Sequence, residues 1–261
     1  MLHIHFGAGR LGLGLIAPYF RKSGSELYLL NRSVSATNDT GSTQLDPQRR
    51  NELLRNNTKK VYVIQPPGGS AGTSETVPYD GYCLYDQNNV EELTRSLARK
   101  STKKEEGVIV TASILKPANY RSVIQALNVL CRMKEEEGAI GSVFLIACEN
   151  TLSAHEVFAD EQLSELIHLE TRRHVKCVPA LVDRMCVGLE EYPGDETTGH
   201  QPMVLVRAEE YGSLKLELRP DIEDLPEQQN RVQQTFRCGE ANQELASQWC
   251  SLVDCFIRFP G

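Results

Sequence analysis

The stretch LHIHFGAGRLGLG, residues 2–14, decides the fold that we predict for this chain. Its first residues alternate as in a buried strand and then break into glycines at positions 7, 9, 12 and 14. An apolar segment compatible with a helix follows over 15–22, and a second apolar strand is predicted at 26–30. Strand, glycine-rich turn, helix and second strand in this order are typical of a βαβ unit that binds a dinucleotide.

Each glycine of the turn has its own predicted role. Gly7 allows the tight turn, Gly9 lets the backbone approach a diphosphate without a Cβ in the way, and Gly12 lets the helix pack closely on the strand. The start of the helix offers free N–H groups and a partial positive charge to the phosphates. The residues predicted to bind the cofactor at this turn are Gly7, Ala8, Gly9, Arg10, Leu11 and Gly12.

The remaining pattern alternates between short apolar runs and amphipathic segments. Strands are predicted at 61–64, 79–85, 108–112, 143–148 and 175–178. Helices are predicted to begin at Asp46-Pro47 and to span 88–100, 120–134 and 162–173. Such alternation predicts an α/β fold with a doubly wound, mostly parallel Rossmann-type sheet. Residues 203–210 and 213–219 alternate like an antiparallel extension, and 228–257 is predicted to be helical in parts.

These segments predict a dinucleotide-binding domain over 1–220 and a short helical tail over 221–261. In open α/β sheets the ligand lies outside the carboxyl ends of the strands. The residues predicted to share that edge are Gly7 to Gly12, Asn31-Arg32, Thr111-Ala112-Ser113, Glu149-Asn150 and Asp183-Arg184. Cofactor contacts are expected there from the glycine turn, Asn31, Arg32, Ser33, Thr111, Ala112, Ser113, Glu149 and Asn150.

Composition argues against several classes of partner. The 261 residues carry a net charge of −7 and no basic stripe with interleaved aromatics, so nucleic acid is not an expected partner. No apolar run has the length of a membrane span. The eight cysteines contain no CxxC pair, which suits a reducing compartment, and we expect a cytoplasmic protein. The histidines show no metal-ligand spacing, and His3 and His5 are expected to pack on one face of the first strand.

The residue that ends the second strand informs the choice of cofactor. An acidic side chain normally stands there in NAD-binding proteins and holds the ribose 2′-hydroxyl. Here the strand runs into Asn31, Arg32 and Ser33, which can all donate hydrogen bonds to a 2′-phosphate. We therefore predict NADP in preference to NAD. The alternative is that Arg32 is a solvated loop residue and that NAD binds weakly.

Several segments resemble one family of enzymes. They are HFGAG at 5–9, IACEN at 146–150, Val182-Asp183-Arg184 and RAEEY at 207–211. In order and spacing they are similar to the nucleotide-binding half of mannitol-1-phosphate 5-dehydrogenase and the long-chain mannitol and fructuronate dehydrogenases, through about residue 220. The resemblance implies hydride transfer between nicotinamide and a sugar alcohol or sugar phosphate, without metal.

The resemblance also implies catalytic roles for two residues. Asn150 would hold the substrate oxygen in an oxyanion-type contact, and Asp183 would tune the proton-transfer network nearby. Each residue has a structural alternative, since Asn150 could cap the following helix and Asp183 could pair with Arg184. For Asn150 the functional interpretation is favoured, whereas for Asp183 the two are evenly balanced.

The chain departs from the family pattern at the general base. The family uses a lysine in a second, mostly helical domain, and this chain has no lysine or histidine after residue 220. Three explanations stay open: a shortened chain, a partner chain that supplies the missing half, or a protein that binds nucleotide without turnover. Apolar residues between 238 and 259 recur at helical spacing, so this face is expected to cover the chain's own sheet or to form a dimer contact.

Two other functions compete with the dehydrogenase interpretation. Tyr211 and Lys215 form the Tyr-x-x-x-Lys pair of short-chain dehydrogenases, but that pair requires a helix and this segment alternates like a strand. A nucleotide-binding subunit or sensor without turnover is the stronger rival. Polyol-dependent reduction of NADP by the purified chain would exclude it.

Overall fold

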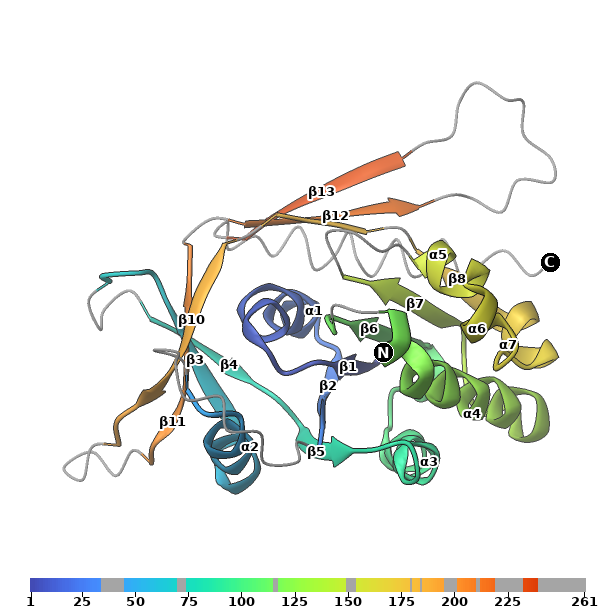
Figure 1. Cartoon of the computed structure of the whole chain (residues 1–261), viewed down its shortest axis with the longest axis horizontal. Coiled ribbons are helices and arrows are strands. Elements are labelled where there is room, and N and C mark those ends of the chain that lie inside the picture. Colours follow the sequence, from blue (N-terminus) through green and yellow to red (C-terminus); the bar gives the residue numbers. More distant parts are fainter. Residues whose placement is uncertain are drawn as a thin grey trace.

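The computed structural model describes residues 1–33, 45–69, 74–114, 117–148, 154–178, 180–183, 185–194, 201–209, 212–218 and 232–238. Its largest sheet contains six parallel strands in the order β5-β2-β1-β6-β7-β8 (Figure 1). These strands are β1 (Leu2–Phe6), β2 (Glu26–Arg32), β5 (Gly81–Tyr85), β6 (Val108–Ala112), β7 (Val143–Ala147) and β8 (Val175–Cys177). Numbered along the chain, the order is 3-2-1-4-5-6, which is usual for a dinucleotide-binding sheet. The predicted Rossmann-type fold is confirmed.

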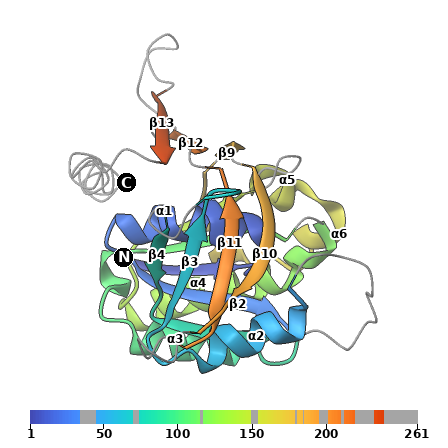
Figure 2. The ribbon, with the colours of Figure 1, turned by 90° about the vertical axis from the view of Figure 1, so that its left-hand side faces the viewer.

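Two smaller sheets complete the strand structure. A four-stranded sheet in the order β10-β11-β3-β4 stands beside the main sheet (Figure 2). A three-stranded antiparallel sheet has the order β13-β12-β9. The strands are β3 (Val61–Gln65), β4 (Glu75–Pro78), β9 (Ala180–Asp183), β10 (Cys186–Tyr192), β11 (Met203–Ala208), β12 (Gly212–Leu218) and β13 (Val232–Cys238).

Three predictions need correction. The strand at 61–64 exists, but it pairs with β11 and β4 and does not join the main sheet. The helix predicted at 162–173 is two short helices, and the Asp160 side chain caps the first by accepting from the Leu163 N–H at 3.0 Å. Residues 232–238, expected to be partly helical, form β13 because they pair with β12 along its whole length. The other residues of the predicted tail lie outside the described ranges.

The helical segments are distributed over both faces of the main sheet. They are η1 (Gly12–Ile16), α1 (Ala17–Lys22), α2 (Pro47–Asn56), α3 (Val90–Lys100), η3 (Lys104–Glu106), η4 (Pro117–Tyr120), α4 (Arg121–Glu137), α5 (Ala154–Ala159), α6 (Glu161–Ser164) and α7 (Leu169–His174). As predicted, Asp46 caps α2: its carboxylate accepts from the Arg49 N–H at 2.9 Å, and Pro47 stands at the first helical position.

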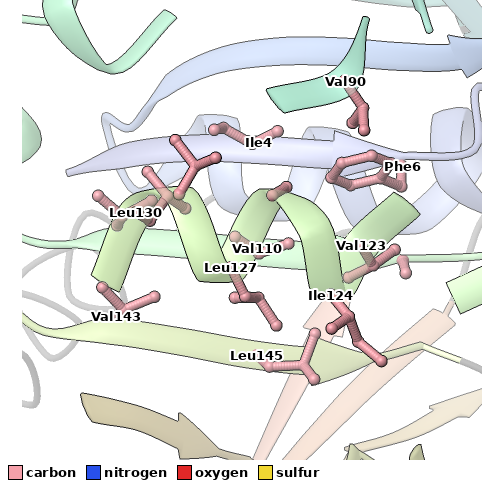
Figure 3. Close-up of a cluster of buried hydrophobic side chains, with 14 of the residues drawn as sticks. Ile4, Phe6, Val90, Val110, Val123, Ile124, Leu127, Leu130, Val143 and Leu145 are labelled. Atoms are coloured by element: carbon pink, nitrogen blue, oxygen red, sulfur yellow. The ribbon is translucent and has the colours of Figure 1, made fainter. Parts of the chain in front are cut away.

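The main core lies between the sheet and α4 (Figure 3). Fully buried Ile124 and Leu127 of α4 face strand residues such as Ile4, Val110 and Leu145. On the opposite face, η1 and α1 pack against the main sheet and are covered in turn by the two smaller sheets. The apolar side chains of the helix after the glycine turn are therefore buried between the main sheet and the smaller sheets, which holds the turn in place.

The first turns of this helix are a π-helix, and Pro18 explains why. Proline has no N–H, and its ring clashes with the carbonyl four residues earlier. The Ala17 N–H bonds to the Gly12 carbonyl, five residues back, so the Leu13 carbonyl loses its usual partner. The hydroxyl of Tyr62, on β3, donates to that carbonyl at 2.9 Å in a fully buried setting. One side chain of the four-stranded sheet thus completes the backbone of the glycine helix.

Replacing Tyr62 by phenylalanine tests this contact. We expect Tyr62→Phe to lower the free energy of unfolding by about 1–3 kcal/mol, because a buried carbonyl loses its donor. Half-buried Tyr192, on β10 of the same sheet, provides the control, and Tyr192→Phe should stay within about 0.5 kcal/mol of the parent chain. Urea unfolding followed by circular dichroism measures both. Equal losses in the two variants would contradict the assignment.

Candidate functional site

The candidate site is the carboxyl edge of the main sheet, where the turns after three neighbouring strands meet. The Gly7 N–H bonds to the Leu30 carbonyl at 2.9 Å, which ties the glycine turn to the end of β2. The Ser113 N–H bonds to the Phe6 carbonyl at 2.9 Å, which ties the turn after β6 to the end of β1. The strand order reverses between β1 and β6, so the turn stands at the switch point where such sheets bind ligands.

The glycines of the turn differ in what surrounds them. Gly7 has a φ of +106°, and a Cβ there would collide with the carbonyl of Ser113. A Cβ on Gly12 would collide with both the Gly7 carbonyl and the His5 ring. A Cβ on Gly9, in contrast, would meet no heavy atom within 4 Å. Gly7 and Gly12 are therefore required by packing, whereas Gly9 faces open space at the edge of the sheet.

Gly14 is a glycine whose role the sequence analysis missed. A Cβ there would come within 2.6 Å of the Cys186 Sγ and 3.2 Å of a Val206 methyl group. The absence of a side chain at Gly14 thus allows β10 and β11 to pack closely against the π-helix. Its signal in the sequence is its place two residues after Gly12, in line with the apolar face of the helix.

Two buried histidines on β1 belong to the hydrogen-bond network that supports the glycine turn. The Thr111 hydroxyl lies 2.7 Å from the His3 Nε2 and 2.7 Å from the His5 Nδ1, and the His5 Nε2 lies 3.1 Å from the Gly7 carbonyl. Because a carbonyl can only accept, His5 carries its proton on Nε2. Thr111 must then donate to His5 and accept from the His3 Nε2. The Ser113 hydroxyl also donates to the Gly7 carbonyl at 3.1 Å.

Both rings are neutral near neutral pH. Burial lowers the pKa of His5 to about 4, although its hydrogen bond to Gly7 opposes the shift. Burial and the neighbouring His5 hold the pKa of His3 well below its usual value. The expectation that these histidines pack on one face of β1 is confirmed, since both are fully buried and the His3 ring lies 4.7 Å from that of Phe20.

The three residues at the end of β2 that were predicted to bind the cofactor differ in their exposure to solvent. Asn31 is 9% exposed, and its Nδ2 donates to the Asn51 Oδ1 at 3.0 Å. Arg32 and Ser33 are exposed, and an Arg32 guanidinium nitrogen donates to the Asn119 Oδ1 at 3.1 Å. The side chain of Asn31 is therefore committed to the interior, and only Arg32 and Ser33 present side chains to solvent. Asn51, on α2, is a supporting residue that sequence reasoning missed.

Among the other residues predicted to line the site, some are buried beneath the turn and some are exposed at the edge. Thr111 and Ala112 are fully buried, so they support the turn from inside and their side chains do not reach the open edge. Arg10 is exposed, and its guanidinium donates to the Val187 carbonyl at 3.4 Å. Glu149, Asn150 and Arg184 lie outside the described residues.

Asp183 and Lys215 belong to the three-stranded sheet. Asp183 ends β9, which pairs with β12, so the rule that placed this residue at the edge of the parallel sheet does not apply. Lys215 lies within β12, which excludes the helical geometry that a Tyr-x-x-x-Lys pair requires. Tyr211 lies outside the described residues.

Two kinds of feature are absent from the residues that the structure describes. No described helix combines the length and apolar character needed to cross a membrane. Within the same residues, no group of three or more histidine, cysteine, aspartate or glutamate side chains is placed to hold a metal ion.

Comparisons with known proteins indicate distant relatives of one kind. The chain is 25% identical over 189 residues to the mannitol-1-phosphate 5-dehydrogenase of Lactococcus lactis subsp. cremoris (strain SK11), an alignment that covers 71% of this chain and 42% of the relative. It is 24% identical over 198 residues to that of Aureobasidium melanogenum, covering 74% and 44%. No family model matches. The chain thus spans less than half the length of these curated relatives.

The contrast between two glycines gives a test of the turn. We expect Gly12→Ala to lower the free energy of unfolding by at least about 2 kcal/mol, because its methyl group overlaps backbone and the His5 ring. Gly9→Ala should change it by no more than about 0.5 kcal/mol, because the space is open. Denaturant unfolding measures both, and a large loss for Gly9→Ala would contradict the description of that space.

The buried histidines predict an acid sensitivity. His5 takes up a proton near pH 6.5 when unfolded but near pH 4 when folded, so it destabilises the fold as pH falls below 6.5. The free energy of unfolding should fall by about 1.4 kcal/mol per pH unit for this group between pH 6.5 and 4. His5→Gln should remove that part of the slope, whereas His168→Gln, at an exposed position, should retain it. Identical slopes in both variants would refute the assignment.

Proposed function

We propose that this chain binds a nicotinamide dinucleotide at the carboxyl edge of its main sheet and forms the nucleotide-binding part of a polyol dehydrogenase. One observation carries the proposal: Gly9, at the switch point of a sheet with the 3-2-1-4-5-6 order, has open space where a Cβ would stand. A backbone that approaches a diphosphate needs this arrangement. The distant mannitol-1-phosphate 5-dehydrogenase relatives support the same class of activity.

The residues of the turn have defined tasks in this proposal. The first N–H groups of a helix have no partner within it, so those at Arg10 and Leu11 suit the diphosphate. His5, Thr111 and Ser113 hold the Gly7 carbonyl in place and keep the turn rigid. Because His5 is neutral, no charge beneath the turn competes with that of the helix start.

The chemistry that the cofactor supplies is transfer of a hydride to or from a sugar alcohol or its phosphate. We propose that Asn150 holds the reacting oxygen and that Asp183 tunes proton transfer near it. Removal of the hydroxyl proton requires a base. The given residues after 220 contain no lysine or histidine, so the proposal assigns this base to no residue of that stretch.

We further propose that NADP is preferred to NAD. No acidic side chain ends β2, and the exposed Arg32 and Ser33 are donors suited to a 2′-phosphate. Arg32 contacts a neutral amide at 3.1 Å, so its charge is available to an anion.

The test combines binding and turnover on the same sample. We expect calorimetry to show NADP binding at least about tenfold tighter than NAD, a difference of about 1.4 kcal/mol. Gly9→Ala, a matched variant expected to fold normally, should weaken both nucleotides about tenfold or more because its methyl group takes up the space of the diphosphate. Mannitol, mannitol 1-phosphate and fructose 6-phosphate are then supplied and nicotinamide absorbance is followed.

The outcomes separate the alternatives. Turnover of any of the three substrates supports the dehydrogenase. Binding without turnover favours a nucleotide-binding subunit or sensor and counts against catalysis by this chain alone. Tighter binding of NAD would refute the NADP preference, and failure to bind either nucleotide would refute the proposed function.

A further inference from the structure

Arg50, in the first turn of α2, is half-buried, and none of the described residues forms an ion pair with it. Its Nε is shielded from solvent and has no hydrogen-bond partner in the part of the chain that the structure describes. The neighbouring residue on the same helix shows the contrast, since Arg49 pairs with Glu191 at 2.6 Å and with Glu52 at 2.8 Å. A buried donor without an acceptor costs about 1–3 kcal/mol. Arg50 therefore lacks the acceptor that its position calls for.

The groups around Arg50 are mostly neutral. Asn51, the next residue, accepts hydrogen bonds at its Oδ1 from the Asn31 amide at 3.0 Å and from the Tyr82 hydroxyl at 2.6 Å. Burial raises the pKa of Tyr82 to about 12, so its hydroxyl stays neutral. Burial lowers the pKa of Arg50 itself, and Tyr82 and Asp46 oppose that shift. The Asp46 carboxylate is already engaged with the Arg49 N–H at 2.9 Å.

The location of Arg50 suggests what the missing acceptor is. The bond from Asn51 to Asn31 places the first turns of α2 beside the end of β2, next to the strand that bears the glycine turn. In a sheet of this order the end of the second strand lies near the adenosine ribose. A guanidinium whose Nε has no partner among the described residues favours an anion at this point, and a phosphate monoester matches its planar donors.

We propose that Arg50 is the residue that binds the 2′-phosphate of the nucleotide, so that preference for a 2′-phosphorylated ribose depends on Arg50 more than on Arg32. This inference rests on the proposed function. The residue at the end of β2 is Asn31, a neutral amide bonded to Asn51, so no carboxylate of this residue repels the phosphate. Arg32 is exposed, so solvent and salt screen its charge and weaken its contribution.

The experiment measures two probes on the full chain by calorimetry. They are 2′,5′-ADP (adenosine 2′,5′-bisphosphate) and 5′-AMP, which differ only in the 2′-phosphate. We expect Arg50→Met to weaken 2′,5′-ADP by about 10- to 100-fold, the range for a hydrogen bond to a charged group, and to leave 5′-AMP unchanged within about twofold. Arg32→Met should weaken 2′,5′-ADP by less than about fivefold. Arg55→Met, at an exposed position on the same helix, is the matched control and should change neither probe.

Further readouts distinguish phosphate binding from a structural role. Because Arg50 forms no ion pair with any residue in the described ranges, Arg50→Met should not lower the free energy of unfolding, and Arg50→Lys should retain part of the preference. The preference of the parent chain for 2′,5′-ADP should shrink as pH falls through about 6, where a phosphate monoester loses its second charge. That measurement stands even if Arg50→Met fails to fold.

The contrary results separate this inference from the proposed function. If 5′-AMP binds but 2′,5′-ADP binds no tighter, or if Arg50→Met weakens both probes equally, the inference is overturned and the proposed function stands. A larger loss for Arg32→Met than for Arg50→Met also overturns it. If neither probe and neither NADP nor NAD binds, the proposed function itself fails.

Discussion

The hydrogen bonds that converge on the Gly7 carbonyl are the constraint on which the rest of the site depends. This oxygen accepts from the Gly9 N–H at 2.7 Å, from the His5 ring and from the Ser113 hydroxyl. One donor belongs to the turn, one to β1 and one to the turn after β6. These three bonds therefore join β1, the glycine turn and the turn after β6 at one carbonyl oxygen. With the turn fixed, the direction of the following helix is fixed as well.

The same network restricts which residues the chain can tolerate around it. The His5 ring occupies the space beside Gly12, so a larger residue at 12 and the present ring at 5 exclude each other. Thr111 serves both histidines with one hydroxyl, and this requires a neutral His5 ring because His5 accepts at its Nδ1. Burial ensures that neutrality by disfavouring the charged rings. Polar residues inside the core thus determine the backbone geometry at its surface.

The second sheet is part of the site's support, although it lies apart from the parallel strands. Tyr62 completes the backbone of the π-helix that follows the turn, and Gly14 lets β10 and β11 approach that helix. The helix is held on one side by the main sheet and on the other by the smaller sheets. In the proposed function the start of this helix binds phosphate, and packing between the sheets holds it in place.

By itself, the sequence determined the parallel sheet, the glycine turn and the capped start of α2, because glycine, proline and apolar periodicity act over a few neighbouring residues. It did not determine that β3 leaves the main sheet, that 162–173 breaks into two helices, or that β13 is a strand, because pairing partners far along the chain decide those outcomes. The same holds for the site. Gly9 was recognisable from spacing, whereas the inward turn of Asn31, the role of Thr111 beneath the turn and the isolation of Arg50 depend on which distant side chains become neighbours. Only the tertiary structure brings those neighbours together, and burial then determines which polar groups are paired and which are left without a partner.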